Sequence, residues 1–126
     1  MIIKIEMQSE IPIYVQLRNE IVLGIGRGEL KAGEVLPTVR QMAEDIGVNT
    51  MTVNKAYQIL KQEGYIETDR RRGSIVSTQV LLKQEFRKKA EQELLLLIAE
   101  ASIQGIKQEE FLQLCQQIYQ EMQPVC

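Results

Sequence analysis

The sequence predicts a mainly α-helical protein with a small β wing: a winged helix-turn-helix followed by a C-terminal αα-hairpin. Residues 36–64 have the pattern of two short amphipathic helices around a tight glycine turn, which is typical of a helix-turn-helix. Residues 65–77 hold two short apolar segments around an Arg-rich turn and predict a β-hairpin. Long apolar stripes at helical spacing occupy residues 78–126. We therefore expect a winged helix-turn-helix domain at residues 1–77 and a two-helix dimerisation tail at residues 78–126.

The first helix is expected to begin near Pro12, after a loose start with some strand character at residues 1–10. Ser9 and Pro12 are typical of a helix start. Apolar residues then recur every fourth position and predict one buried stripe, made of Ile13, Leu17, Ile21 and Ile25. In the connector that follows, Gly33 predicts a turn and Val35-Leu36 a possible two-residue strand.

The helix-turn-helix is bounded by capping residues. Thr38 is a favourable N-cap, and Gln41 three residues later completes the pattern of a capping box. Gly47 supplies the backbone freedom that the end of this helix requires. Asn49 is expected to cap the second helix, and Gly64 to end it. The expected buried faces are Val39, Met42, Ala43 and Ile46 in the first helix and Val53, Ala56, Tyr57 and Leu60 in the second.

Composition excludes several classes of function. The 126 residues contain no histidine and two cysteines, so a structural zinc site, which needs about four Cys or His ligands, is excluded. No pattern of an activated nucleophile or a phosphate-binding loop is present, and we expect neither an enzyme nor a cofactor. The chain starts with no pattern of a secretory signal and holds no apolar run of membrane-spanning length, so we expect a cytoplasmic protein that does not enter a membrane.

The net charge of −2 neither supports nor excludes a nucleic-acid partner. Residues 1–78 carry ten basic and ten acidic side chains, whereas residues 79–126 carry five and seven. Any affinity for DNA must therefore come from local groups of cations.

The tail has more apolar surface than a two-helix hairpin can bury on its own. Gly105 is expected to separate its two helices. We expect this surface to meet a second copy of the chain, although the hairpin folding back on its own winged domain is the alternative. The expected dimerisation residues are Leu82, Phe86, Ala90, Leu94, Leu97, Ile98, Ala101, Phe111, Leu112, Cys115, Ile118 and Tyr119. The tail is too short to enclose a ligand in one chain, so a small-molecule effector, of unknown identity, would sit at the dimer interface or between domains.

Many spaced positions of residues 11–77 resemble the N-terminal domain of the GntR transcription regulators, and the short two-helix tail resembles the YtrA-type subfamily. The matching motifs are Tyr14-x-Gln16, Gly28-x-Leu30-x-x-Gly33, Leu36-Pro37-Thr38-x-Arg40, Gly47-Val48-Asn49, Thr52-Val53, Ala56-Tyr57 and Glu63-Gly64. The resemblance implies a regulator, most simply a repressor, that binds a pseudo-palindromic double-stranded DNA operator as a homodimer. Departures from the family pattern are Ala32 before Gly33, Asn49-Thr50-Met51 at the start of the recognition helix, and Arg71 in place of a wing glycine.

A helix-turn-helix presents the N-terminal part of its second helix to base edges in the major groove. The outer face of that helix and the Arg-rich turn therefore form the expected DNA surface, and the resemblance adds Arg40 on the preceding helix. The candidate DNA-binding residues are Thr38, Arg40, Asn49, Thr50, Met51, Thr52, Asn54, Lys55, Gln58, Arg70, Arg71, Arg72 and Gly73. The alternative is that these are ordinary solvated polar residues of a winged-helix protein-interaction module without specific DNA binding.

Overall fold

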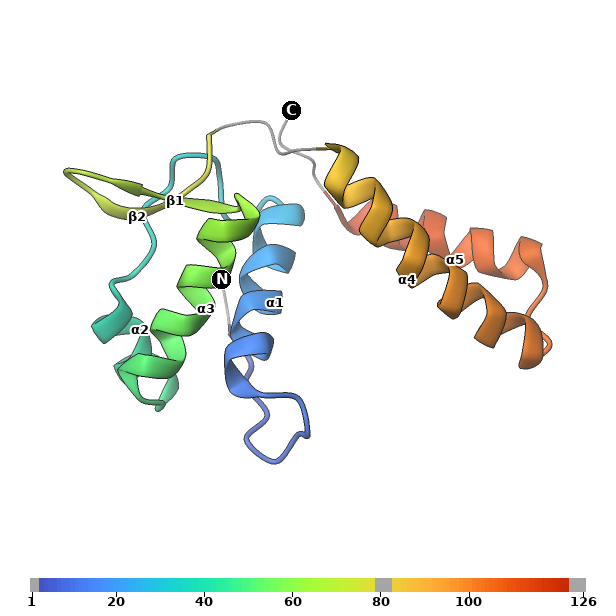
Figure 1. The fold of residues 1–126 in the computed structure, drawn as a ribbon, viewed down its shortest axis with the longest axis horizontal. Coiled ribbons are helices and arrows are strands. Elements are labelled where there is room, and N and C mark those ends of the chain that lie inside the picture. The colour runs from blue at the N-terminus through green and yellow to red at the C-terminus, as the bar shows by residue number, and fades with distance from the viewer. Residues whose placement is uncertain (1–2, 79–82, 123–126) are drawn as a thin grey trace. The chain divides into compact units, whose positions relative to one another are not determined.

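A computed structural model describes residues 3–78 and 83–122 (Figure 1). The described residues fall into two compact units, one within Met1–Gln79 and one within Val80–Met122. They contain five helices and one two-stranded antiparallel sheet. The mainly α fold with a small β wing, predicted from the sequence, is confirmed.

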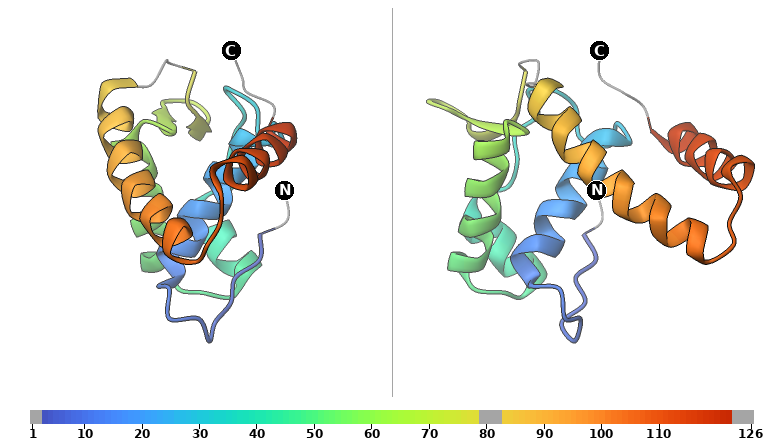
Figure 2. Two further views of the ribbon diagram at one scale, coloured as in Figure 1. Left: turned by 90° about the vertical axis from the view of Figure 1, so that its right-hand side faces the viewer. Right: turned by 45° about the vertical axis from the view of Figure 1, so that its right-hand side comes forward.

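Helix α1 (Ile13–Gly26) begins directly after Pro12 and lies beside α3 (Thr50–Glu63), as Figures 1 and 2 show. The strand character expected before α1 is wrong for residues 3–10, which form turns and irregular backbone. Backbone groups of this segment form hydrogen bonds with the Gln16 side chain and not with a neighbouring strand. The Gln16 amide accepts a hydrogen bond from the Glu6 N–H at 2.8 Å and donates to the carbonyl oxygens of Glu6 and Ile11 at 3.0 and 2.8 Å.

Helix α2 (Val39–Ile46) begins at the predicted cap, where the Thr38 hydroxyl oxygen accepts the Gln41 N–H at 3.0 Å. The other half of the expected capping box is not formed, because the Gln41 side chain donates to the Asp45 carboxylate at 2.8 Å instead. Gly47 ends the helix with φ +74°, a conformation that side chains disfavour.

The wing consists of β1 (Ile66–Asp69) and β2 (Gly73–Val76), paired antiparallel from Ile66 opposite Val76 to Asp69 opposite Gly73. Val35 forms an isolated bridge to Ile75, so the short strand suggested for Val35-Leu36 is one bridging residue. The Leu36 N–H also donates to the Ser74 carbonyl at 2.8 Å. The connector before α2 is therefore tied to the wing.

The core of the first unit is formed by the predicted apolar faces of the three helices, except Ile13, together with Leu30, Leu36 and residues of the wing. Tyr57 of α3 is 1% exposed, and its hydroxyl donates to the Pro37 carbonyl at 2.7 Å. Burial raises the pKa of Tyr57 to about 12, so the hydroxyl stays protonated and keeps this hydrogen bond. This hydrogen bond holds α3 against Pro37, the residue before the Thr38 cap.

A partly buried ion pair joins α1 to the end of α3. The Arg18 guanidinium donates to both oxygens of the Glu63 carboxylate, at 2.9 and 3.0 Å, and lies 5.5 Å from the centroid of the Tyr65 ring. The hydrogen bonds to Glu63 raise the pKa of Arg18 despite its partial burial. Two parallel N–H donors fix the geometry of the pair.

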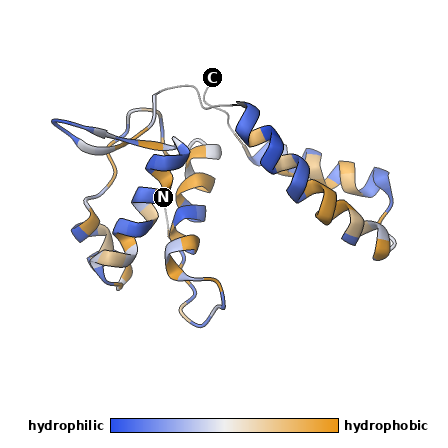
Figure 3. Cartoon of the chain, in the orientation of Figure 1, coloured by the Kyte–Doolittle hydropathy of each residue, from blue (hydrophilic) through white to orange (hydrophobic). Residues whose placement is uncertain are grey.

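The second unit contains α4 (Lys83–Ile103) and α5 (Gln108–Glu121), separated at Gly105, which has φ +83°. Figure 3 shows that apolar residues are concentrated in the C-terminal half of α4. Ala101 is the only buried residue among residues 84–122. No helix in the described part of the chain is long and apolar enough to cross a membrane.

We predict that Arg18→Ala lowers the free energy of unfolding by about 1–2 kcal/mol, because it leaves the partly buried Glu63 carboxylate without its charged partner. Arg87→Ala is the matched control. It removes the same side-chain type from an exposed pair with Glu91, whose partners are 83% and 68% exposed, and should cost less than about 0.5 kcal/mol. Urea denaturation measures both, and equal costs would show that the Arg18 pair contributes no more than a surface pair.

Candidate nucleic-acid interface

The outer face of α3 carries the predicted recognition residues. Val53, Ala56, Tyr57 and Leu60 are 0–1% exposed and form the inner face. The outer face is polar apart from Met51, which is 80% exposed. Asn49, Thr50, Asn54, Lys55 and Gln58 are also exposed. Their side chains can donate to or accept from base edges, whereas Met51 offers only apolar contact.

Two of the candidate DNA-binding residues, Asn49 and Thr52, are engaged in the capping of α3. The Asn49 side-chain oxygen accepts the Thr52 N–H at 2.8 Å and the Thr52 hydroxyl at 2.9 Å. Thr52 is half-buried. Asn49 and Thr52 therefore fix the start of the recognition helix, and in this arrangement the Thr52 hydroxyl proton points to the cap.

Arg40 lies in the first turn of α2, with 87% of its side chain exposed. Its nearest carboxylate is Glu44, at 3.9 Å and also mostly exposed. An exposed pair at this distance is weak. The Arg40 guanidinium is thus available to an anion.

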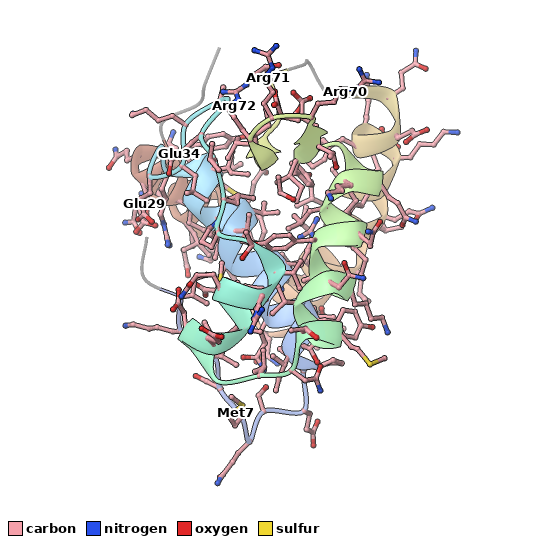
Figure 4. All side chains as sticks on the ribbon, turned by 90° about the vertical axis from the view of Figure 1, so that its left-hand side faces the viewer. Met7, Glu29, Glu34, Arg70, Arg71 and Arg72 are labelled. Carbon is pink, nitrogen blue, oxygen red and sulfur yellow. The ribbon has the colours of Figure 1, made fainter. Side chains whose placement is uncertain are left out.

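The three wing arginines differ in their surroundings. Figure 4 shows Arg70, Arg71 and Arg72 at one end of the first unit, with Met7 at its other end. The Arg72 guanidinium donates to the Asp69 carboxylate at 3.0 Å and to the Gly33 carbonyl at 3.4 Å. Arg70 and Arg71 are exposed, and no carboxylate of a described residue forms an ion pair with either. The cations of this turn without a carboxylate partner among the described residues are therefore Arg70 and Arg71. The Arg72 guanidinium instead binds Asp69 and the Gly33 carbonyl of the connector.

Asp69 organises the turn that carries these arginines. Its second carboxylate oxygen accepts the N–H groups of Arg71 and Arg72 at 2.8 and 3.0 Å. The Arg72 side chain, together with these two N–H groups, holds the pKa of the Asp69 carboxyl below its usual value. Gly73, with φ +88°, completes the turn. Asp is typical of the first position of a turn, but no sequence signal indicated that Asp69 would also bind the Arg72 side chain.

Lys55 is exposed on the outer face of α3, and its side chain reaches across to α1. Its ammonium nitrogen is 4.0 Å from the centroid of the Tyr14 ring. In the sequence pattern Tyr14 broadens the apolar stripe of the first helix and is part of a family motif, but no sequence signal placed it beside the recognition helix. The structure thus brings one residue of α1 to the candidate interface.

The predicted dimerisation residues lie on α4 and α5 within the second unit, except Leu82, which falls outside the described residues. Ala101 is buried, and Ala90, Phe111 and Cys115 are half-buried. The remaining ones are exposed: Phe86, Leu94, Leu97, Ile98, Leu112, Ile118 and Tyr119. A groove of about 320 Å³ lies in this hairpin, with Ile98, Phe111 and Leu112 among its lining residues.

Comparison with known proteins identifies the family. The family described as "Bacterial regulatory proteins, gntR family" matches residues 13–76. The Bacillus subtilis protein YhcF, an uncharacterised HTH-type transcriptional regulator, is 31% identical over 86% of this chain and 90% of its own. The HTH-type transcriptional repressor YtrA of Bacillus subtilis is 43% identical over 60% of this chain and 58% of its own.

Solved structures extend the likeness to the whole chain. A Listeria monocytogenes EGD-e protein described as a transcriptional antiterminator has a TM-score of 0.86 at 28% identity, covering 100% of this chain and 97% of its own. YtrA from Sulfolobus acidocaldarius, a GntR-family transcription factor, has a TM-score of 0.60 at 34% identity, covering 94% and 97%. These are regulators and not enzymes, in agreement with the sequence. The chain therefore belongs to the GntR family of bacterial transcriptional regulators, and to the YtrA type within it.

Proposed function

We propose that this protein is a cytoplasmic repressor that binds a pseudo-palindromic DNA operator as a homodimer formed by its C-terminal helices. The observation that carries the proposal is the outer face of α3, which is polar and exposed while its inner face is fully buried. The likeness to the repressor YtrA supports repression as the direction of control.

In this proposal the N-terminal half of α3 enters the major groove. The Asn49 cap leaves Thr50, Met51 and Asn54 at the leading end of the helix. An Asn side chain can pair with adenine through two hydrogen bonds, and Met51 can contact a thymine methyl group. Arg40 binds the phosphates beside this groove.

The wing binds next to the recognition helix. Arg70 and Arg71 place two cations on the hairpin turn that are not neutralised by a carboxylate of the described residues. Such cations bind phosphates or enter a narrow minor groove, where the negative potential is strongest. Arg72 has a different role and fixes the turn through Asp69.

The proposed dimer forms through the apolar surface of α4 and α5. Leu97 is 51% exposed and Leu94 44% exposed, and an unpartnered surface of this kind is unfavourable in water. In a two-fold symmetric dimer, this apolar surface of each copy is buried against the same surface of the other. The two-fold axis of the dimer also matches an operator with two symmetric half-sites. A small-molecule effector would act by binding one dimer geometry better than another.

Selection of the purified protein on a random double-stranded DNA library, at near-physiological salt, tests the proposal. We expect enrichment of an inverted repeat whose half-site spacing reflects the dimer. Enrichment without symmetry would contradict the dimeric mode of binding. Lack of enrichment even at low salt, where phosphate contacts are strongest, would favour a protein-interaction module.

The wing arginines should differ in their effect on the salt dependence of binding. Arg71→Ala should reduce the slope of log K against log salt by about 1.8, because each of the two protomers loses one phosphate contact and each contact contributes about 0.9. Arg72→Ala should reduce it by less, because the Arg72 charge is paired with Asp69. Lys88→Ala, on the exposed face of α4, is the control. Fluorescence anisotropy titrations over a range of salt concentrations measure the slopes, and a larger effect of Arg72→Ala would contradict this assignment.

The dimer surface can be tested with two leucines of α4. Leu97→Glu places a charge in the proposed interface and should yield a monomer at micromolar concentration. Leu95→Glu is the matched control, because Leu95 is 75% exposed and lies about 200° from Leu97 around a helix of 3.6 residues per turn. Sedimentation equilibrium measures the mass of each variant. A monomeric parent protein, or dissociation caused by Leu95→Glu alone, would contradict the proposed interface.

A further inference from the structure

Tyr14 lies outside the recognition helix and outside the wing, yet it contacts the candidate DNA surface. It is the second residue of α1, and the Lys55 ammonium of α3 lies 4.0 Å from its ring centroid. At this distance the face of an aromatic ring attracts a cation. The contact therefore restrains a long, otherwise flexible side chain on the recognition helix.

The Tyr14 ring is itself held in place. It packs against the core cluster and is half-buried. Two residues later, Gln16 ties the preceding segment to α1 through its three hydrogen bonds to Glu6 and Ile11. Because the ring is already fixed, forming the contact costs conformational entropy only for the Lys55 side chain. A mobile ring would add its own entropy cost.

The support that Lys55 receives differs from that of two other cations of the first unit. Arg18 and Arg72 are each held by a carboxylate, which cancels their charge. In the part of the chain that the structure describes, no carboxylate forms an ion pair with Lys55. An aromatic face orients the ammonium and leaves its full positive charge for an external anion.

We infer that Tyr14 is a positioning residue of the DNA interface: its ring holds the Lys55 ammonium at the α1 side of α3, where Lys55 binds a DNA phosphate and does not read a base. This inference rests on the proposed DNA-binding function. Because Lys55 is drawn towards α1, the central outer surface of α3 is left to Met51, Asn54 and Gln58 for contact with base edges. Lys55 then contributes to affinity for all sequences alike.

Three variants and one double variant test this inference on the operator obtained by selection. Lys55→Gln should reduce the salt slope by about 1.8, because each protomer loses one phosphate contact worth about 0.9, and should leave the preferred sequence unchanged. Tyr14→Leu removes the ring but keeps an apolar side chain, and should weaken binding about two- to fivefold. Tyr14→Phe keeps the ring and should retain the affinity that Tyr14→Leu loses. In the Lys55→Gln background, Tyr14→Leu should have no further effect.

Several outcomes would overturn the inference. A changed sequence preference with an unchanged salt slope in Lys55→Gln would make Lys55 a base reader. An equal loss for Tyr14→Leu with and without Lys55 would make Tyr14 a purely structural residue, and an equal loss for Tyr14→Phe would assign the effect to its hydroxyl. If the parent protein selects no DNA, it is the proposed function that fails.

A second measurement on the DNA-free protein covers the case in which Tyr14→Leu does not fold. The ring current of Tyr14 should shift the NMR signals of the Lys55 ε-methylene protons upfield. Tyr14→Phe should preserve this shift. Its absence in the folded parent protein would contradict the contact on which the inference depends.

Discussion

Burial of one side of α3 is the interaction on which the rest of the structure depends. Val53, Ala56, Tyr57 and Leu60 fill the centre of the core, so the opposite side of the same helix must face outwards. The helix is then fixed at its start by the Asn49 cap and further along by the hydrogen bond from the Tyr57 hydroxyl to Pro37. An exposed recognition surface is thus a direct result of a well-packed interior.

For the proposed DNA binding, the groups that surround each cation matter more than the net charge of the chain, which is −2. Carboxylates neutralise and anchor the cations that have structural roles, Arg18 and Arg72. Other cations are exposed or are supported by an aromatic ring, as Lys55 is by Tyr14. Proposed DNA contacts and structural ion pairs therefore differ in how closely a carboxylate holds each cation: at 2.9–3.0 Å for Arg18 and Arg72, but only at 3.9 Å, in an exposed pair, for Arg40.

Most of the fold was predictable from the sequence because its signals are local. The Thr38 and Asn49 caps and the glycines at 47, 64 and 105 set helix ends within a few residues of themselves. The reciprocal capping bond of Gln41 failed because Asp45, one turn later, competes for its amide. The Lys55–Tyr14 contact and the bond from Arg72 to Gly33 join residues far apart in sequence. No local pattern predicts such contacts, since they depend on how the elements pack.

In the proposed docking, α3 lies in the major groove, and Arg70 and Arg71 of the wing bind phosphates or enter the adjacent minor groove. Methylation interference on the selected operator tests it most directly, because guanine N7 faces the major groove and adenine N3 the minor groove. N7 methylation within each half-site should block binding. N3 methylation at flanking positions should weaken binding if the wing enters the minor groove, and should leave it unchanged if the wing binds phosphates alone. Interference at adenine N3 alone, or in only one half-site, would contradict this mode of docking.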